Sequence, residues 1–182
     1  MGVLRKGVIG LTVLAGFSLA ATAASADGYT SGSPAYELPA IWRGLYGGVN
    51  LGHADADGGN GVVGGVQLGY NWQAQQIVYG VEGDISLSGA HSIDWLASLR
   101  GRVGYLIQPK ILVYGTAGLG LVNGSGTNGT DTGFVYGLGV EGKLTRTMSA
   151  RLEYLAYDTD NAHSHSETVG VIRAGLNIKL NP

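Results

Sequence analysis

The chain has 182 residues, including 33 glycines and no cysteine, and only 13% of its residues are charged. An average soluble domain has about 7% glycine and about 25% charged residues, so this composition is unusual. The lack of cysteine excludes a disulfide scaffold, a thiolate metal site and a cysteine nucleophile. The formal charge of −2 gives no electrostatic reason to expect nucleic-acid binding.

Residues 1–26 predict a cleaved signal peptide. Arg5 and Lys6 form a basic start, residues 7–20 are apolar, and Ala24-Ser25-Ala26 is a small-x-small cleavage site. The alternative, a membrane-anchoring helix, would need an apolar stretch of ~20 residues. Residues 27–41 are rich in small residues and proline and predict a flexible N-terminal lead-in, which leaves residues 42–182 for the folded domain.

Alternating apolar and polar residues recur from Arg43 to the end of the chain and predict β-strands. The mature chain has no run of ~18 apolar residues, so no further membrane helix is expected. We expect eight strands, at residues 43–53, 61–73, 76–87, 93–106, 111–123, 132–144, 148–158 and 168–180.

The charged residues fall on one face of each predicted strand. Glu82 and Asp84 share a face that excludes Val81 and Ile85, and the later strands repeat this separation. Strand 111–123 is ambiguous, because Tyr114 and Thr116 are the only candidates for its polar face. The expected charged face consists of Glu82, Asp84, Arg100, Arg102, Glu141, Lys143, Arg151, Glu153, Arg173 and Lys179.

Two interpretations fit this alternation, a soluble sandwich or a membrane barrel with its apolar face turned outward. The predicted strands are about 10–14 residues long, whereas globular strands have ~5–6 and tilted membrane strands need ~9–11. Strands that face lipid must pair every backbone group, so the sheet has to close. The sequence therefore predicts an all-β, eight-stranded antiparallel up-and-down transmembrane β-barrel with its charges inside.

The connections and the aromatic residues predict an orientation. Connections after the first, third, fifth and seventh strands are expected to have about 7, 5, 8 and 10 residues, and the others about 2–4, which places the short ones at the periplasmic rim. Amphipathic rings favour the membrane interfaces, although strand propensity alone also enriches aromatic residues. The expected interface residues are Tyr70, Trp72, Tyr79 and Tyr105 on the periplasmic side, and Trp95 and Phe134 on the outer side.

Residues 64–73, 78–84, 94–105 and 172–180, together with Glu153-Tyr154-Leu155, resemble the small outer-membrane β-barrel, or porin-family, proteins of alphaproteobacteria. The resemblance implies an eight-stranded barrel in the Gram-negative outer membrane, without a peptidoglycan-binding domain. It implies outer-membrane lipids, lipopolysaccharide and the barrel-assembly machinery as partners, and a monomer or weak oligomer. Such chains commonly end on an aromatic residue, whereas this one ends Leu180-Asn181-Pro182.

Chemical sites are few in the sequence. The last long loop could hold zinc or carry the residue types of an acyl-transfer triad, but a solvated polar loop is the favoured interpretation. Residues 55–60 are a partial match to a calcium loop. His53 and His91 could ligate heme, as some porin-family relatives are described to do. The zinc candidates in the last long loop are Asp158, Asp160, His163, His165 and Glu167. We assign no catalytic residue, cofactor or metal site.

The interior charges admit a structural and a conducting interpretation. An eight-stranded barrel is just wide enough for side chains to fill it, which favours a closed interior. Inward glycines such as Gly69, Gly80, Gly137 and Gly139 are expected to leave volume for water. The sequence therefore predicts a non-enzymatic surface barrel that contributes to envelope integrity and meets the environment through its outer loops. The alternatives are a narrow diffusion channel and a heme- or ligand-binding surface protein.

Overall fold

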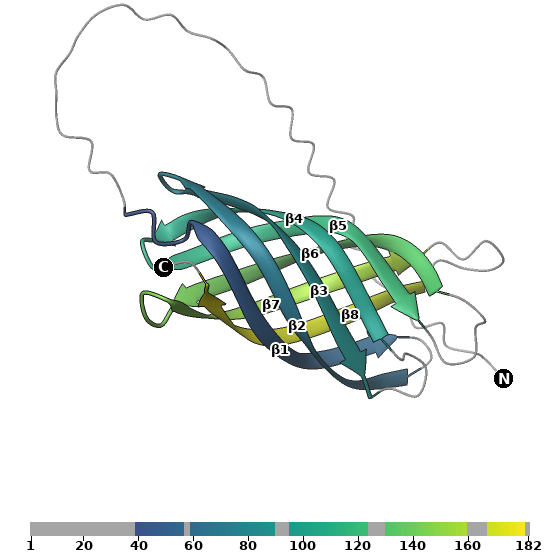
Figure 1. Ribbon diagram of the computed structural model, residues 1–182. Helices are drawn as coiled ribbons and strands as arrows, with labels where there is room; N and C mark the ends of the chain where they lie inside the picture. Colours follow the sequence, from purple (N-terminus) through teal and green to yellow (C-terminus); the bar gives the residue numbers. More distant parts are fainter. Residues whose placement is uncertain (1–38, 57–58, 90–94, 124–129, 160–166, 181–182) are drawn as a thin grey trace, which may run out of the picture. The chain divides into compact units, whose positions relative to one another are not determined.

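The computed structural model describes residues 39–56, 59–89, 95–123, 130–159 and 167–180 (Figure 1). These residues form a closed antiparallel barrel in which each strand pairs with the next and β1 pairs with β8. The described part of the chain contains no helix long and apolar enough to cross a membrane. The strands are β1 Gly44–Ala56, β2 Gly59–Ala74, β3 Ile77–Ser88, β4 Trp95–Gln108, β5 Ile111–Asn123, β6 Thr130–Lys143, β7 Met148–Thr159 and β8 Glu167–Lys179.

The predicted fold class is confirmed, and the strand ends lie within three residues of those expected. The expected connection of about seven residues after the first strand is wrong. Strand β1 continues to Ala56, which pairs with Gly59 at the start of β2, and Asp55 pairs with Asn60. The two strands are separated only by Asp57-Gly58, a residue pair favoured between the strands of a tight hairpin.

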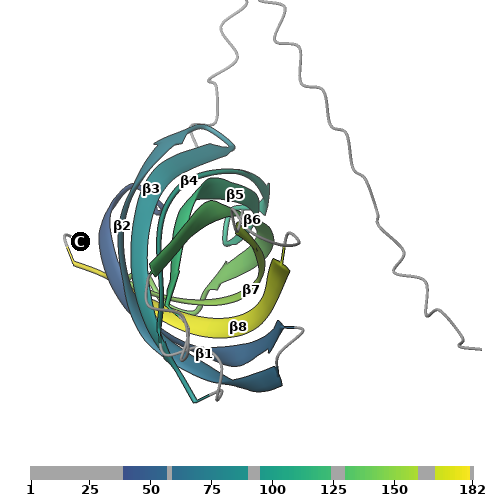
Figure 2. The ribbon, with the colours of Figure 1, turned by 90° about the vertical axis from the view of Figure 1, so that its right-hand side faces the viewer.

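The two ends of the barrel differ in their connections. Residues 75–76, 109–110 and 144–147 join strands at one end, which we call the short-turn end, and β1 begins and β8 finishes there. We call the other end the loop end; it carries the connections after β1, β3, β5 and β7. Figure 2 shows the ring of strands from the loop end.

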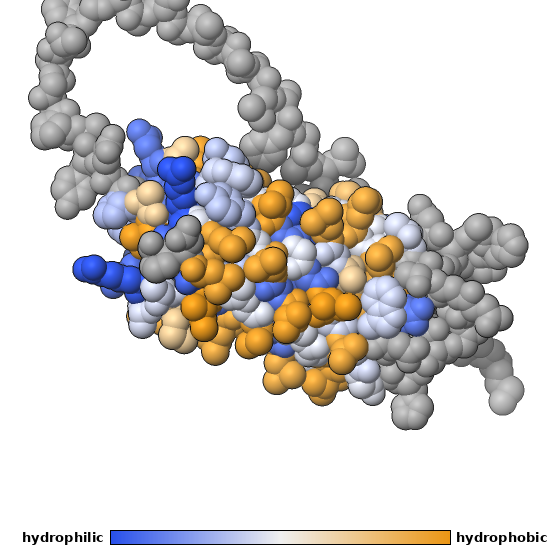
Figure 3. Space-filling model, in the orientation of Figure 1, coloured by the Kyte–Doolittle hydropathy of each residue, from blue (hydrophilic) through white to orange (hydrophobic). Residues whose placement is uncertain are grey.

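Large apolar side chains point away from the barrel axis. Leu99 is 66% exposed and Leu138 is 71% exposed, whereas Arg100, next to Leu99 in the chain, is 1% exposed. Figure 3 shows hydrophobic side chains over the middle of the visible wall and strongly hydrophilic ones at the short-turn end. This inverted arrangement suits a wall surrounded by lipid, because the hydrocarbon core solvates apolar side chains and excludes charges.

Each end of the interior contains a cluster of buried apolar side chains. The loop-end cluster consists of Ala54, Val63, Leu96, Val122, Val135, Leu155, Tyr157, Val169 and Val171. The short-turn cluster consists of Trp42, Val78, Leu106, Leu112 and Tyr114, with Ile41 packed against it. The charged side chains occupy the space between the two clusters.

The last residues of the predicted lead-in contact the barrel. The Trp42 indole donates a hydrogen bond to the Pro109 carbonyl (3.1 Å), and the Trp42 amide donates to Gln73 Oε1 (3.1 Å). Gln73 Nε2 also donates to the Pro39 carbonyl (3.4 Å). These bonds fix residues 39–42 across the short-turn end. The predicted signal peptide and residues 27–38 lie outside the described residues.

Candidate functional site: the charged barrel interior

Eight ionisable side chains meet inside the barrel, on strands β3, β4, β6, β7 and β8. Side chains alternate between the two faces of a strand, so residues two apart in sequence enter the interior together. The strand register places Glu82 opposite Arg100, Glu141 opposite Arg151, and Glu153 opposite Arg173. The set is balanced, with four carboxylates and four guanidinium groups, each at most 7% exposed: Glu82, Asp84, Glu141, Glu153, Arg100, Arg102, Arg151 and Arg173.

Arg100 links three of the carboxylates. Its Nη2 atom lies 2.6 Å from Glu82 Oε1 and 2.9 Å from Asp84 Oδ1, and its Nη1 atom lies 3.2 Å from Glu153 Oε1. Arg173 bridges the last two from β8, at 3.0 Å to Asp84 Oδ2 and 2.8 Å to Glu153 Oε2. The charges therefore form one connected network rather than isolated pairs.

Glu82 joins this network to the rest of the interior. Arg151 Nη1 donates to Glu82 Oε2 at 2.5 Å, and the Tyr46 hydroxyl donates to the same oxygen at 2.6 Å. Arg102 donates to the Tyr46 oxygen (3.0 Å), and its guanidinium lies 4.1 Å from the centre of the Tyr114 ring. The aromatic groups thus help to hold Arg102 by a hydrogen bond and a cation–π contact.

Glu141 is held by polar groups from three strands. Arg102 Nη2 donates to Glu141 Oε2 (2.8 Å), and Ser149 Oγ and Asn177 Nδ2 donate to Glu141 Oε1 at 2.5 and 3.0 Å. Asn177 also accepts from Gln67 Nε2 (2.9 Å), whose own Oε1 accepts from Asn50 Nδ2 (2.6 Å). This uncharged chain extends the network to β1 and β2.

Three of the inward glycines, Gly69, Gly104 and Gly139, do not leave open volume, which corrects the sequence expectation at these positions. Tyr46 lies opposite Gly69, and Tyr114 lies opposite Gly104 on one side and Gly139 on the other. A Cβ atom on Gly69 or Gly139 would overlap these tyrosine rings. The glycines therefore make room for aromatic side chains that fill the interior. Tyrosines and glycines on the inward face of neighbouring strands could have indicated this packing from the sequence, but no role was predicted for Tyr46.

Lys143 and Lys179 were expected in the charge network, and the structure places them apart from it. Both have the inward parity, but each is the last residue of its strand and lies at the short-turn end. Lys143 Nζ lies 4.6 Å from the centre of the Trp42 ring. Within the described ranges, neither lysine is within ion-pair distance of a carboxylate. Position along the strand explains this separation, because the paired charges lie near the middle of the barrel and the two lysines lie at its rim.

The expected interface aromatics lie on the outer wall. Near the short-turn end, the Trp72 and Tyr79 rings stack with centroids 5.7 Å apart, Tyr70 lies 4.7 Å from Trp72, and the Tyr105 hydroxyl donates to Gln76 Oε1. Trp95 is the first residue of β4, at the loop end. Phe134 is 52% exposed and lies five residues into β6 from that end.

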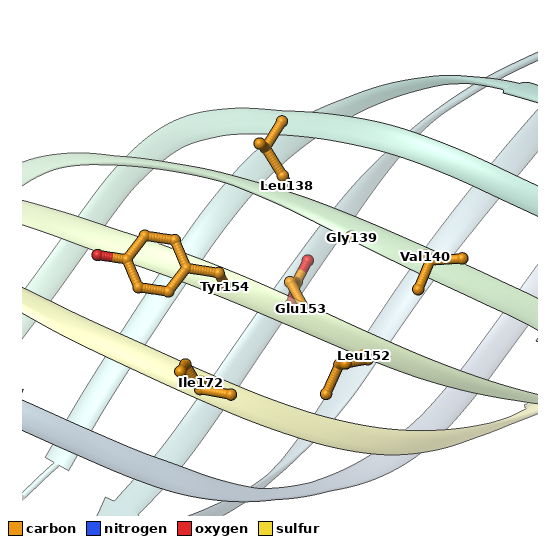
Figure 4. A pocket seen from close by; sticks show the side chains of 7 residues that line it. All are labelled: Leu138, Gly139, Val140, Leu152, Glu153, Tyr154 and Ile172. Atoms are coloured by element: carbon orange, nitrogen blue, oxygen red, sulfur yellow. The ribbon is translucent and has the colours of Figure 1, made fainter. Parts of the chain in front are cut away.

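One part of the outer wall carries a shallow apolar pocket of about 340 Å³ (Figure 4). Leu138, Leu152, Tyr154 and Ile172 surround it, with their side chains on the outer face. Glu153 belongs to the same strand as Leu152 and Tyr154, but it has the opposite parity and is 2% exposed. Adjacent residues of β7 thus face opposite sides of the wall: Leu152 and Tyr154 face outward, and Glu153 faces the charge network.

The loop candidates from the sequence have mixed outcomes. Asp55 and Asn60, from the partial match to a calcium loop, are paired strand residues, and Asp57 lies outside the described residues. His53 is exposed on the outer face of β1. His91, Asp160, His163 and His165 lie outside the described residues, so the zinc, heme and acyl-transfer hypotheses remain predictions.

Comparisons with known proteins agree with this architecture. A family model described as "Outer membrane protein beta-barrel domain" matches residues 9–173. The chain is 36% identical over 166 residues to the 22 kDa outer membrane protein of Rhizobium leguminosarum bv. viciae, covering 76% of this chain and 78% of that protein. It is 31% identical over 160 residues to the 31 kDa outer-membrane immunogenic protein of Brucella melitensis biotype 1, covering 66% and 67%.

Among solved structures, Neisserial surface protein A is similar in fold. The two structures superpose with a TM-score of 0.56 at 19% sequence identity, over 75% of this chain and 97% of that chain. At this level of identity the similarity concerns the barrel architecture.

Proposed function

Because this chain belongs to the outer membrane protein β-barrel domain family, we propose that it is a sealed structural barrel that contributes to the integrity of the cell envelope. The resemblance to alphaproteobacterial outer-membrane barrels and the outer-membrane location are confirmed by the relatives. The proposal adds that the interior stabilises the barrel and does not conduct solutes. It assigns no catalytic role to the chain.

The closed interior carries this proposal. An eight-stranded barrel has little space inside, and here that space holds a connected ion-pair network between two apolar clusters. Leu155 and Val135 are fully buried in the loop-end cluster, and Leu112 is fully buried in the short-turn cluster. A hydrated ion would have to displace both clusters and break several buried ion pairs to pass.

The wall and the orientation support the proposed partners. Outward residues such as Leu99 and Leu138 suit contact with lipid chains, and short turns belong on the periplasmic side in barrels of this kind. The loop end then faces outward, toward lipopolysaccharide and the surroundings of the cell. The Brucella relative is named an immunogenic outer-membrane protein, which supports a surface role. The barrel-assembly machinery would insert the chain, as a monomer or weak oligomer.

Planar-bilayer recording tests the sealed interior. We expect the refolded wild-type protein to show no unit conductance steps, because both apolar clusters block the axis. A variant that shortens side chains in each cluster, Leu112→Ala with Leu155→Ala, serves as the opened control. Conductance steps in the wild type that change in size in Arg151→Gln would contradict the proposal and favour the narrow channel, because ions would then be passing the charge network.

A further inference from the structure

Three cations at the short-turn end have a different environment from the arginines of the interior. We call Lys143, Arg146 and Lys179 the basic mouth. Lys143 ends β6, Arg146 lies in the following turn, and Lys179 ends β8. They share one stretch of the rim, because β7 pairs with both β6 and β8.

Backbone hydrogen bonds hold the turn of Arg146 beside Lys179. The Leu144 amide donates to the Met148 carbonyl (3.0 Å), which closes the turn. The Lys179 amide donates to the Thr147 carbonyl (2.8 Å), which ties this turn to the end of β8. The Met148 amide also donates to Thr145 Oγ1 (2.9 Å). The spacing of the two cations is therefore set by the sheet and not by a long free loop.

A pocket of about 670 Å³ lies between this turn and the segment that closes the short-turn end. Arg146, Thr147 and Lys179 form its polar side. Pro39, Ala40 and Ile41 form its apolar side, and Pro39 is tied to the barrel by the hydrogen bond from Gln73. The pocket thus combines two cationic side chains with an apolar surface.

Within the described part of the chain, the basic mouth has no close ion-pair partner. Each interior arginine has a carboxylate oxygen within 2.8 Å, as for Arg102 and Glu141. Over the ranges that the structure describes, Lys143, Arg146 and Lys179 form no ion pair; Glu141 attracts Lys143, and Lys179 repels it. Arg43 and Lys110 add positive charge at the same end, which makes an external anion favourable there.

The surroundings of the pocket indicate that this anion carries apolar chains. Ile178 and Leu180 flank Lys179 in sequence and are 49% and 54% exposed, and Leu144 beside Arg146 in the turn is 61% exposed. The Trp72–Tyr79 stack lies on the outer wall near this end, where amphipathic rings suit a membrane interface. A lipid whose chains cover these apolar residues would place its phosphate at the depth of the two cations.

We propose that the pocket formed by Arg146, Lys179 and residues 39–41 binds the headgroup of an anionic phospholipid in the periplasmic leaflet. Arginine suits this role because its planar guanidinium can donate two parallel hydrogen bonds to one phosphate. The apolar pocket wall excludes water from one side of the headgroup. The inference rests on the orientation of the barrel and is independent of whether the interior conducts, so either proposal can fail without the other.

Lipid retention measured by native mass spectrometry tests the site. The full mature chain is refolded into nanodiscs with equal amounts of phosphatidylglycerol and phosphatidylcholine and then released into detergent. We expect the wild type to retain phosphatidylglycerol in roughly tenfold preference, and Arg146→Gln with Lys179→Gln to lose that preference. Lys110→Gln removes a cation at the same end that does not line the pocket, and it should keep the preference.

Two further measurements test whether the pocket needs the whole lipid and whether it needs only positive charge at the two positions. Excess glycerol phosphate should not displace the retained lipid, and Arg146→Lys with Lys179→Arg should keep most of the preference. Unheated gel mobility verifies that every variant is folded.

Four results would overturn the proposal. These are equal retention in the wild type and the double glutamine variant, an equal loss in Lys110→Gln, displacement by glycerol phosphate, and a preference that appears only in Glu37→Gln. Glu37 precedes Pro39 by two residues in the sequence. The last result would mean that this carboxylate of the chain itself, and not a lipid, is the anion that the two cations bind.

Discussion

Glu82 is the residue at which four strands of the barrel meet. Its carboxylate accepts hydrogen bonds from Tyr46 on β1, Arg100 on β4 and Arg151 on β7, while Glu82 itself belongs to β3. A charge this deeply buried is stable only because opposite charges and donors surround it. Removing it would leave its arginine partners without compensation.

We therefore expect Glu82→Gln to lower the free energy of unfolding by about 3 kcal/mol, because it leaves a buried excess of positive charge. Urea unfolding of the refolded protein in lipid vesicles, followed by tryptophan fluorescence, measures the change. Asp55→Asn is the control, since Asp55 is exposed and outside the network; its effect should stay within ~0.5 kcal/mol. Equal effects of the two substitutions would contradict the structural role of the network.

A second prediction concerns the glycines that accommodate tyrosine rings. Gly139→Ala should destabilise the barrel by ~1–3 kcal/mol, because the new methyl group overlaps the Tyr114 ring. Gly142→Ala, on the same strand, is the control, since nothing lies within 4 Å of its Cβ position. In the same urea assay, Tyr114→Leu should relieve much of the penalty in a double-mutant cycle. Additive effects of the two substitutions would show that the ring and the glycine do not interact.

The alternation of side chains predicted which residues face the interior, because the two-residue period is a property of the extended backbone. It could not predict the partners. Asp84 lies opposite Ser98 in the register, yet it also contacts Arg100 and, across the interior, Arg173 on β8. Such contacts depend on how the strands tilt around the axis, which no local pattern encodes. Lys143 was assigned to the network for the same reason, since parity gives a face but no depth.

At the scale of single elements, the hairpin between β2 and β3 has a strained turn. Gln75 has φ of 54° and is the one non-glycine residue with positive φ in the described part of the chain. A two-residue turn with positive φ at its first position favours glycine there. The strands on either side are regularly paired up to Ala74 and Ile77, so the strain is confined to the turn.

Gln75→Gly should therefore raise the free energy of unfolding, by about 0.5 kcal/mol, because relief of the left-handed strain exceeds the added freedom of the unfolded chain. Its backbone carbonyl would still accept the hydrogen bond from Gln73. Gln76→Gly should have the opposite sign, since Gln76 has no positive φ to relieve. Equilibrium unfolding of both variants decides the matter, and a stabilised Gln76→Gly would contradict this explanation.

The strands themselves were largely predictable, whereas the first hairpin was not predicted correctly. Glycines and polar residues between 54 and 60 indicated a long loop, but pairing continues through Asp55 and Ala56. The alternation of apolar and polar residues is weak where glycine and aspartate dominate. Strand pairing can still continue there, because backbone hydrogen bonds need no apolar side chain. The Asp57-Gly58 pair was the better guide, because it favours a tight turn.

At the scale of the whole molecule, closure depends on the pairing of β1 with β8, which extends from Tyr46 with Lys179 to Asp55 with Gly170. A closed barrel has no free strand edge from which detergent can begin to unfold it. We expect the refolded protein to migrate faster in a gel without heating than after boiling. Leu51→Pro should remove this difference, because Leu51 pairs with Gly64 on one side and Ala174 on the other.

The control for this comparison is Leu51→Ala, which keeps the backbone donor and should retain the faster migration. A faster band that persists in Leu51→Pro would mean that the seam between the first and last strands does not hold the structure closed.

Because β1 and β8 are neighbours, the two termini of the barrel leave from the same rim. Circular permutation follows as a design option: a short peptide could join the old ends, and the chain could be cut between Ala56 and Gly59. Every strand would keep both neighbours, while the new ends would emerge at the opposite rim. In the orientation proposed above, a cargo fused to such an end would be displayed outside the cell instead of being left beneath the membrane.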